Sequence, residues 1–309
     1  MPAGDSPRYR SEGARKTALL TKIRTLAPQR GLSPQALRRE YVLQRFLALL
    51  FAAQPSPWVL KGGSGLLIRL PGARHSEDID LLDARGDLHV ALDELRALCQ
   101  DTPPNPFRYA LTPVDPMTGH AEGTSVKVIA SMAAAVFDRF SVDLSVQPTF
   151  DGIIDRQVPT PILILGDVDP PPPVSLYPLP AQIADKVAAM LERHGPTRTT
   201  ASTRYRDLVD LVLITQNFDI DAARTRTALH TQAARRSLTL PATLRSPAPL
   251  WVSGYRTEAA RSSLHPRLHT LTTALDVAGA LLNPLLNGTR TTGTWSAHHQ
   301  SWRPPPDPA

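Results

Sequence analysis

A glycine-rich turn followed by a pair of aspartates is the feature that most limits what this chain can fold into. The apolar run Trp58–Leu60 leads into Lys61-Gly62-Gly63-Ser64, and Asp78-Ile79-Asp80 then opens a second apolar run. A strand that ends in glycines exposes backbone N–H groups that no Cβ shields, so the turn can approach an anion closely. Side chains alternate along a strand, so Asp78 and Asp80 are expected on one face.

Two carboxylates on one face of a strand repel each other unless a cation lies between them. Asp-x-Asp is also compatible with a plain turn whose acids are solvated. Here Ile79 and Leu81 place apolar side chains on the other face, so the acids would be buried without a cation or a cleft. We therefore interpret Asp78 and Asp80 as ligands of Mg²⁺ or Mn²⁺, which carboxylates and substrate phosphates bind together.

A third carboxylate is expected on a neighbouring strand. The run Phe140–Val146 alternates apolar and polar residues and contains Asp143, with Asp138 as a nearby competitor. A single acid in such a strand can also protect a sheet edge. We favour Asp143 over Asp138 because Asp143 lies within the apolar run. Three acids form the set that two-metal phosphoryl or nucleotidyl transfer uses.

Other common active-site motifs are absent. The sequence contains neither the Walker A pattern nor the dinucleotide fingerprint, and it lacks H-E-x-x-H and G-x-S-x-G. The single cysteine, Cys99, rules out an internal disulfide and a multi-cysteine zinc site. These absences exclude several classes of hydrolase, metalloprotease and nucleotide-binding protein.

Length and composition predict a two-domain protein of the cytoplasm. The chain has 309 residues, a net charge of +6 and only five lysines, and no stretch is apolar enough for a membrane span or a secretory signal. A basic chain favours a polyanionic partner. We expect a basic N-terminal arm over residues 1–32, a first domain over 33–175, a helical second domain over 176–286 and a disordered tail over 287–309.

Hydrophobic periodicity predicts the main elements. Ser33 and Pro34 are typical of a helix start, and apolar spacing continues that helix to residue 53. The remaining expected elements are strands at 58–60, 78–82, 125–132, 138–146 and 160–165, and helices at 63–70, 87–100, 181–193, 203–215, 220–236 and 267–283.

The second domain contains three charged residues that could act in a nucleotide cleft. Lys186 lies among apolar residues of an expected helix, where it could extend to solvent or bind a triphosphate. Asp207 and Asp210 are spaced i, i+3 on the next helix, and their ordinary interpretation is salt bridging to nearby arginines.

Taken together, these motifs resemble the signature of the AbiEii/AbiGii toxin family, which includes the MenT toxins of mycobacteria. The resemblance starts with Lys61-Gly62-Gly63-Ser64, Arg69 and Arg74-x-Ser76-x-Asp78-Ile79-Asp80-Leu81. It continues through Ala184-Asp185-Lys186 and Arg204-x-Arg206-Asp207-Leu208-x-Asp210-Leu211, and it covers roughly residues 35 to 220. Arg206 replaces the family's usual lysine, and Gln182 stands where an acid is common.

The resemblance implies an α+β fold with a polymerase-β-like mixed sheet, followed by a mainly helical C-terminal domain. It implies a toxin that transfers nucleotides from an NTP to tRNA 3′ ends, and a cognate antitoxin, of winged-helix type in some systems. The residues implied as functional are Ser76, Asp78 or Asp80, Lys186, and Asp207 or Asp210. Ser76 would contact phosphate or be a phosphorylation site, and the nucleotide would lie near Lys61, Gly62, Gly63, Ser64, Arg69 and Lys186.

Two other functions use the same residues. A nucleotidyltransferase that modifies a protein hydroxyl with AMP or UMP would need the same metal site. A nucleotide-binding module without catalysis is disfavoured, because Asp78, Asp80 and Asp143 are all present.

Overall fold

The computed structural model describes residues 9–74, 76, 78–100, 105–112, 115–116, 123–147 and 153–305. The chain forms two compact units. Unit 1 contains Met1–Pro71 and His75–Leu176, and unit 2 contains Gly72–Arg74 and Tyr177–Ala309. The boundary expected at residue 175 and the observed division at Leu176 differ by one position. Residues 1–8 of the expected arm and 306–309 of the expected tail lie outside the described residues.

Unit 1 is built on a mixed sheet. Its described strands run in the order β3-β5-β6-β2-β1-β8-β7, with β4 paired beside β5. The strands are β1 (Trp58–Leu60), β2 (Ile79–Asp83), β3 (Arg108–Leu111), β4 (Asp115–Pro116), β5 (Gly123–Met132), β6 (Ala135–Val146), β7 (Asp155–Gln157) and β8 (Val174–Leu176). The helices are α1 (Glu12–Gln29), α2 (Pro34–Leu50), α3 (Gly62–Arg69) and α4 (Leu88–Gln100).

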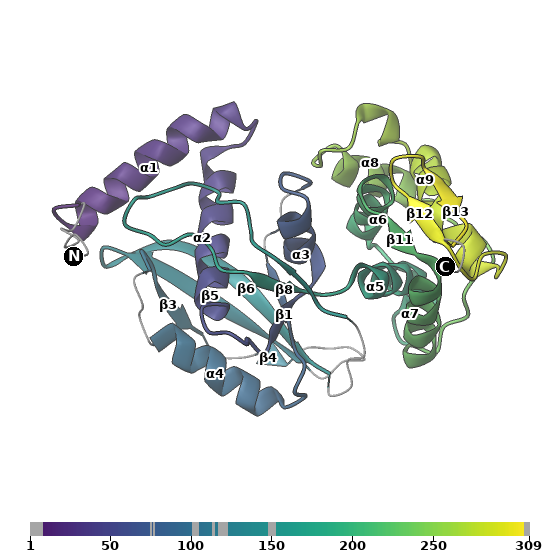
Figure 1. The fold of residues 1–309 in the computed structure, drawn as a ribbon, viewed down its shortest axis with the longest axis horizontal. Coiled ribbons are helices and arrows are strands. Elements are labelled where there is room, and N and C mark those ends of the chain that lie inside the picture. The colour runs from purple at the N-terminus through teal and green to yellow at the C-terminus, as the bar shows by residue number, and fades with distance from the viewer. Residues whose placement is uncertain are drawn as a thin grey trace. The chain divides into compact units, whose positions relative to one another are not determined.

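Helix α2 packs on one face of this sheet (Figure 1), and the polar residues of the strands lie on the other face. The helix starts as predicted, because Ser33 accepts a hydrogen bond from the Ala36 backbone and Pro34 occupies the first turn. The Phe46 ring lies 4.9 Å from the Tyr109 ring and 5.1 Å from the Phe140 ring. Even-numbered residues of β6 around Phe140 therefore form the core, and odd-numbered residues face the other way.

The predicted strand at 160–165 is absent from the structure. The Gln44 side chain of α2 donates to the Thr160 carbonyl and accepts from the Ile162 backbone, both at 2.8 Å. A helix side chain thus takes hydrogen bonds that a neighbouring strand would otherwise make. The predicted strands at 125–132 and 138–146 are confirmed as β5 and β6.

Unit 2 is mainly helical, with α5 (Leu179–Leu191), α6 (Tyr205–Asn217), α7 (Ala222–Arg235), α8 (Trp251–Ala259) and α9 (Leu271–Leu286). Four of these correspond to predicted helices, while α8 was missed. Gly254 lies inside α8, and glycine in a helix interior disfavours a helix prediction. A Cβ at this position would lie 2.4 Å from the Tyr205 ring. Close packing on α6 therefore requires the glycine.

The expected disordered tail is wrong over most of its length. Strands β12 (Thr294–Ser296) and β13 (Ser301–Arg303) form a hairpin, and β12 also pairs with β11 (Ile220–Asp221). The polar composition of this segment favoured disorder, but the segment contains a buried aromatic side chain, that of Trp295. The Trp295 indole N–H donates to the Thr215 carbonyl at 2.8 Å, and its ring packs edge-on against the Trp302 ring. One large buried side chain holds an otherwise polar segment on α6.

None of the helices in the described part of the chain combines the length and the apolar character that a membrane crossing requires.

Replacing Trp295 with alanine should lower the free energy of unfolding of unit 2 by about 3–5 kcal/mol, since the variant loses a buried indole and leaves a cavity. Denaturant titration of the full chain measures the change. Trp302→Ala is the control, because Trp302 is partly exposed and should cost less. Equal stability of W295A and wild type would show that the hairpin does not stabilise unit 2.

Candidate active site

The glycine turn lies directly against the second aspartate of the Asp-x-Asp motif. Gly62 begins α3 with a φ of +57°, and a Cβ built on it would lie 1.8 Å from Asp80 Oδ2. The backbone N–H of Lys61 donates to the Asp80 carbonyl at 2.8 Å, which fixes the turn beside β2. Only glycine permits both this φ and this approach, so the carboxylate of Asp80 lies at the N-terminus of α3.

A second carboxylate lies beside Asp80 on the adjacent strand. Strands β2 and β6 are parallel, and Asp80 is the register partner of Asp143. Both residues are half-buried, and Ser125 Oγ on β5 donates to Asp143 Oδ1 at 2.7 Å. Neighbouring strands are about 4.8 Å apart, so two carboxylates in register favour a cation between them. This is the chemistry that Mg²⁺ or Mn²⁺ requires of its protein ligands.

The other two acids are placed differently. Asp78 is exposed and stands one residue before β2. Asp138 is buried and binds the Arg39 guanidinium of α2 at 2.6 and 2.9 Å. Across the described ranges, no three His, Cys, Asp or Glu side chains are arranged as a metal-binding group. The structure therefore brings together Asp80 and Asp143, while Asp138 serves an ion pair within the fold.

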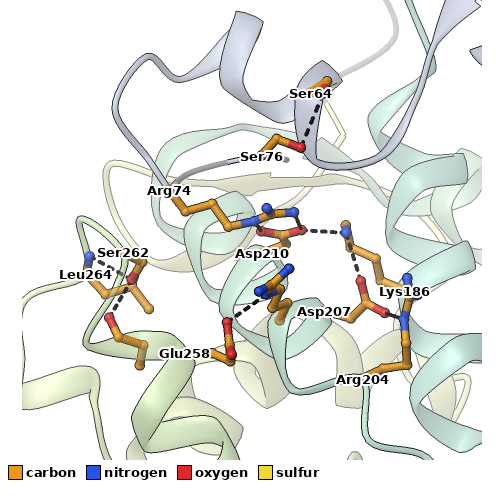
Figure 2. A network of polar contacts seen from close by, with 12 residues as sticks. Ser64, Arg74, Ser76, Lys186, Arg204, Asp207, Asp210, Glu258, Ser262 and Leu264 are labelled. Carbon is orange, nitrogen blue, oxygen red and sulfur yellow. Dashed lines mark hydrogen bonds and ion pairs between the residues drawn. The ribbon is translucent and has the colours of Figure 1, made fainter. Parts of the chain in front are cut away.

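Two buried serines hold the backbone between the turn and β2. Ser64 Oγ donates to the Asp78 carbonyl at 2.6 Å and lies 3.2 Å from Ser76 Oγ, as Figure 2 shows for the two hydroxyls. Ser76 Oγ is also 3.1 Å from the same carbonyl. Ser76 was expected to contact phosphate or to be phosphorylated, but its hydroxyl here supports the main chain of the Asp-x-Asp segment.

Two residues assigned to nucleotide binding have distinct surroundings. Arg69, at the end of α3, forms an ion pair with Asp155 of β7 at 2.6 Å and is largely buried. Lys61 is half-buried at the N-terminus of α3, next to Gly62 and Gly63. The ion pair of Arg69 therefore joins α3 to β7 within unit 1. Lys61 directly precedes Gly62, the residue that lies against the Asp80 carboxylate.

The polar face of the sheet continues with basic residues. On β5, and on β6 from Asp138 onward, odd-numbered residues alternate with buried even-numbered ones. In the register of the two strands, Lys127 pairs with Ser141 and Ile129 pairs with Arg139. Lys127 and Arg139 are exposed. Side chains at every second position share a face, so both cations lie on the same face as Asp143.

Lys186 lies in a separate cluster within unit 2. Its ammonium group on α5 is 3.0 Å from Asp207 Oδ1 and 2.6 Å from Asp210 Oδ2, both on α6 (Figure 2). Arg204 binds the other oxygen of Asp207 at 2.7 Å. Arg74 completes the cluster by binding Asp210 through two nitrogens, at 2.6 and 2.9 Å. Lys186, Asp207 and Asp210, which the family resemblance implies to be functional, are thus joined by ion pairs.

Charge pairing keeps this buried cluster ionised. Burial opposes the charge of Lys186, but attraction to Asp207 and Asp210 outweighs it, so the Lys186 pKa lies above its ordinary value. Burial also opposes ionisation of Asp210, yet Lys186 and Arg74 hold the Asp210 pKa below its ordinary value. A buried charge that loses its partner is costly, so these residues depend on one another.

Sequence reasoning missed two residues. Arg74 stood in the motif without an assigned role, and only the fold shows that it binds Asp210. Ser125 donates to Asp143, but no pattern in the sequence distinguishes it from other strand serines.

The chain is similar to known proteins in sequence and in fold. Residues 45–277 match the family model described as the nucleotidyl transferase AbiEii toxin of type IV toxin–antitoxin systems. No curated protein matches the chain. Among solved structures, MenT4, a nucleotidyltransferase toxin from Mycobacterium tuberculosis, is 17% identical, with a TM-score of 0.50 over 84% of this chain and 98% of that one.

JHP933 from Helicobacter pylori is also similar, with 17% identity and a TM-score of 0.47 over 84% of this chain and 96% of that one. The likeness to MenT4 confirms the expected fold of a mixed sheet followed by a helical unit. The family model spans the carboxylate strands of unit 1 and the ion-pair cluster of unit 2. The chain therefore belongs to the AbiEii family of nucleotidyltransferase toxins of type IV toxin–antitoxin systems.

Proposed function

We propose that this toxin transfers nucleotides from an NTP to the 3′ end of RNA, with the tRNA acceptor end as the target and a divalent cation at Asp80 and Asp143. The observation that carries the proposal is the register pair Asp80–Asp143, with Gly62 packed against the Asp80 carboxylate. The exposed Asp78 would supply the third carboxylate. Mg²⁺ or Mn²⁺ would lower the pKa of the attacking hydroxyl and hold the triphosphate.

The residues of the chain would bind and orient the two substrates. The glycine turn offers unshielded backbone N–H groups at the N-terminus of α3, which suits the phosphates of an NTP. Lys61 lies at the same turn as a candidate point charge. The Asp143 carboxylate, oriented by the hydrogen bond from Ser125, would bind either the attacking hydroxyl or the cation. Modification of this 3′ end would block aminoacylation and so translation.

An RNA acceptor is favoured by the distribution of positive charge. Lys127 and Arg139 lie on the same sheet face as Asp143. In unit 2, residues 221–290 contain nine arginines and three acids. Six of those arginines are exposed: Arg224, Arg235, Arg245, Arg256, Arg261 and Arg267. Exposed cations of this density bind a phosphate backbone without reading its sequence.

An antitoxin is the second expected partner, because the family belongs to toxin–antitoxin systems. We infer that a small winged-helix protein encoded beside this gene neutralises the toxin. The reducing cytoplasm, where tRNA and antitoxin meet, is the proposed compartment.

Transfer is tested by incubating the protein with total tRNA, Mg²⁺ and each labelled NTP in turn. Wild type should label RNA, and Asp80→Asn and Asp143→Asn should each lose at least about 100-fold in activity, as loss of a metal ligand predicts. Asp138→Asn is the control, because that acid pairs with Arg39 and should affect stability instead. Label on protein in place of RNA would favour the protein-modifying alternative, and no label on either would contradict transferase activity.

Gly62→Ala should disable the site without unfolding the protein. The added Cβ would collide with Asp80 Oδ2 and displace that carboxylate from its partner Asp143. Gly31→Ala is a matched control, because Gly31 also has a positive φ, of +67°, but no heavy atom within 4 Å of an added Cβ. Both variants should lose about 1 kcal/mol of stability from backbone strain, but only G62A should lose activity. Equal activity of the two variants would contradict the role assigned to the contact.

Arg139→Gln should weaken RNA binding, with little effect on the turnover number at saturating RNA. Its charge lies on the sheet face that contains Asp143, so its loss removes a phosphate contact and lowers the salt dependence of log K by about 0.7. Arg24→Gln removes the same charge from an exposed position of α1, a helix that packs against α2, and should change neither quantity. Filter binding across a salt series measures both. An unchanged slope for R139Q would rule out this face as the RNA path.

A further inference from the structure

Three residues between α3 and β2 belong to the other unit. The chain leaves unit 1 at Pro71, contributes Gly72–Arg74 to unit 2 and returns to unit 1 at His75. The Ser263 N–H donates to the Ala73 carbonyl at 2.8 Å, and Arg74 forms an antiparallel bridge with Ser262. Ala73 is buried. The main chain at this point is therefore held by the segment that follows α8.

The Arg74 side chain adds a stronger attachment. Its guanidinium binds both oxygens of Asp210, at 2.6 and 2.9 Å, and Figure 2 shows the two groups facing each other. Asp210 has no exposed surface, and its second cation is Lys186 at 2.6 Å. A bidentate arginine–carboxylate pair fixes orientation as well as distance. Lysine could not reproduce it with a single ammonium group.

The attached segment leads directly to the candidate metal ligands. Ser76 follows Arg74 by two residues, and Asp78 and Asp80 follow by four and six. A residue spans at most about 3.6 Å of chain, so Asp78 lies within roughly 14 Å of Arg74. At the far end, Ser64 and Ser76 hold the Asp78 carbonyl, and the Lys61 N–H holds the Asp80 carbonyl. Contacts within unit 2 therefore hold residues 72–74, and contacts within unit 1 hold Ser76 and the carbonyls of Asp78 and Asp80.

We propose that Arg74 is a positioning residue, which, through Asp210 and Lys186, fixes the segment that carries Asp78 and Asp80. Lys186 then acts on the chemistry through this cluster, because its loss would leave Asp207 and Asp210 without the cation that they share. The effect on the metal site rests on the proposed function, whereas the anchoring of the segment does not.

Amide hydrogen exchange of the full chain tests the anchoring without any assay of activity. Arg74→Gln and Asp210→Asn should speed exchange in peptides that span residues 73–80 by tenfold or more, while peptides from α9 stay unchanged. Arg204→Gln is the matched control, because Arg204 belongs to the same cluster through Asp207 but is mostly exposed and remote in sequence from the segment. It should leave residues 73–80 as protected as in wild type.

A second variant covers the case in which R74Q unfolds unit 2. Arg74→Lys keeps the positive charge and loses the bidentate geometry, so it should speed exchange at 73–80 to a smaller degree. Unchanged exchange at 73–80 in both Arg74 variants would overturn the proposal. An equal change in R204Q would also overturn it, because the effect would then belong to the cluster as a whole.

The link to the metal site is measured by Mn²⁺ binding to the protein alone, followed by electron paramagnetic resonance. R74Q should weaken Mn²⁺ binding about 10–100-fold, as loss of a residue that orients metal ligands does, and R204Q should not. Faster exchange with unchanged Mn²⁺ affinity would overturn the positioning role. If wild type neither binds Mn²⁺ nor transfers nucleotides, the proposed function fails, while the exchange data still decide whether Arg74 anchors the segment.

Discussion

The pairing of two aspartates on adjacent parallel strands is the constraint on which the candidate site depends. Asp80 and Asp143 are register partners, so the sheet itself sets their spacing. Like charges at this distance destabilise the fold unless a cation or hydrogen-bond donors compensate. The structure supplies donors around them, with Ser125 on Asp143 and the N-terminus of α3 beside Asp80. The sheet thus holds two carboxylates side by side at the place where we propose that a divalent cation binds.

The parts of the site that could be predicted are those set by local sequence. Alternation along β6 distinguished Asp143 from Asp138, and the structure shows why: Asp138 faces α2 and pairs with Arg39. The Gly62 turn was predicted from its position after an apolar strand. Helices of regular periodicity, such as α2 and α6, were predicted close to their observed bounds. In each case the deciding information lies within a few residues.

The parts that could not be predicted depend on contacts between distant residues. Gln44 replaces a strand partner for residues 160–162, and Trp295 holds a polar hairpin on α6. The sequence left open whether Lys186 extends to solvent or binds a triphosphate, and its partners Asp207 and Asp210 lie on another helix. The motif gave Arg74 no role of its own, because its partner Asp210 is distant in sequence and only the fold shows their ion pair. No local pattern reports such partners.

The excursion of Gly72–Arg74 into unit 2 also has a consequence for the order in which the protein is made. The groups that hold these three residues belong to Asp210, Ser262 and Ser263, all of which follow β8 in the chain. A ribosome-bound chain that has reached only β8 already contains both carboxylate strands, yet it lacks the residues of unit 2 that hold Gly72–Arg74. A truncated product ends in the same state. Under the proposal that Arg74 positions Asp78 and Asp80, the site is therefore complete only after α6 and the segment that follows α8 have been made.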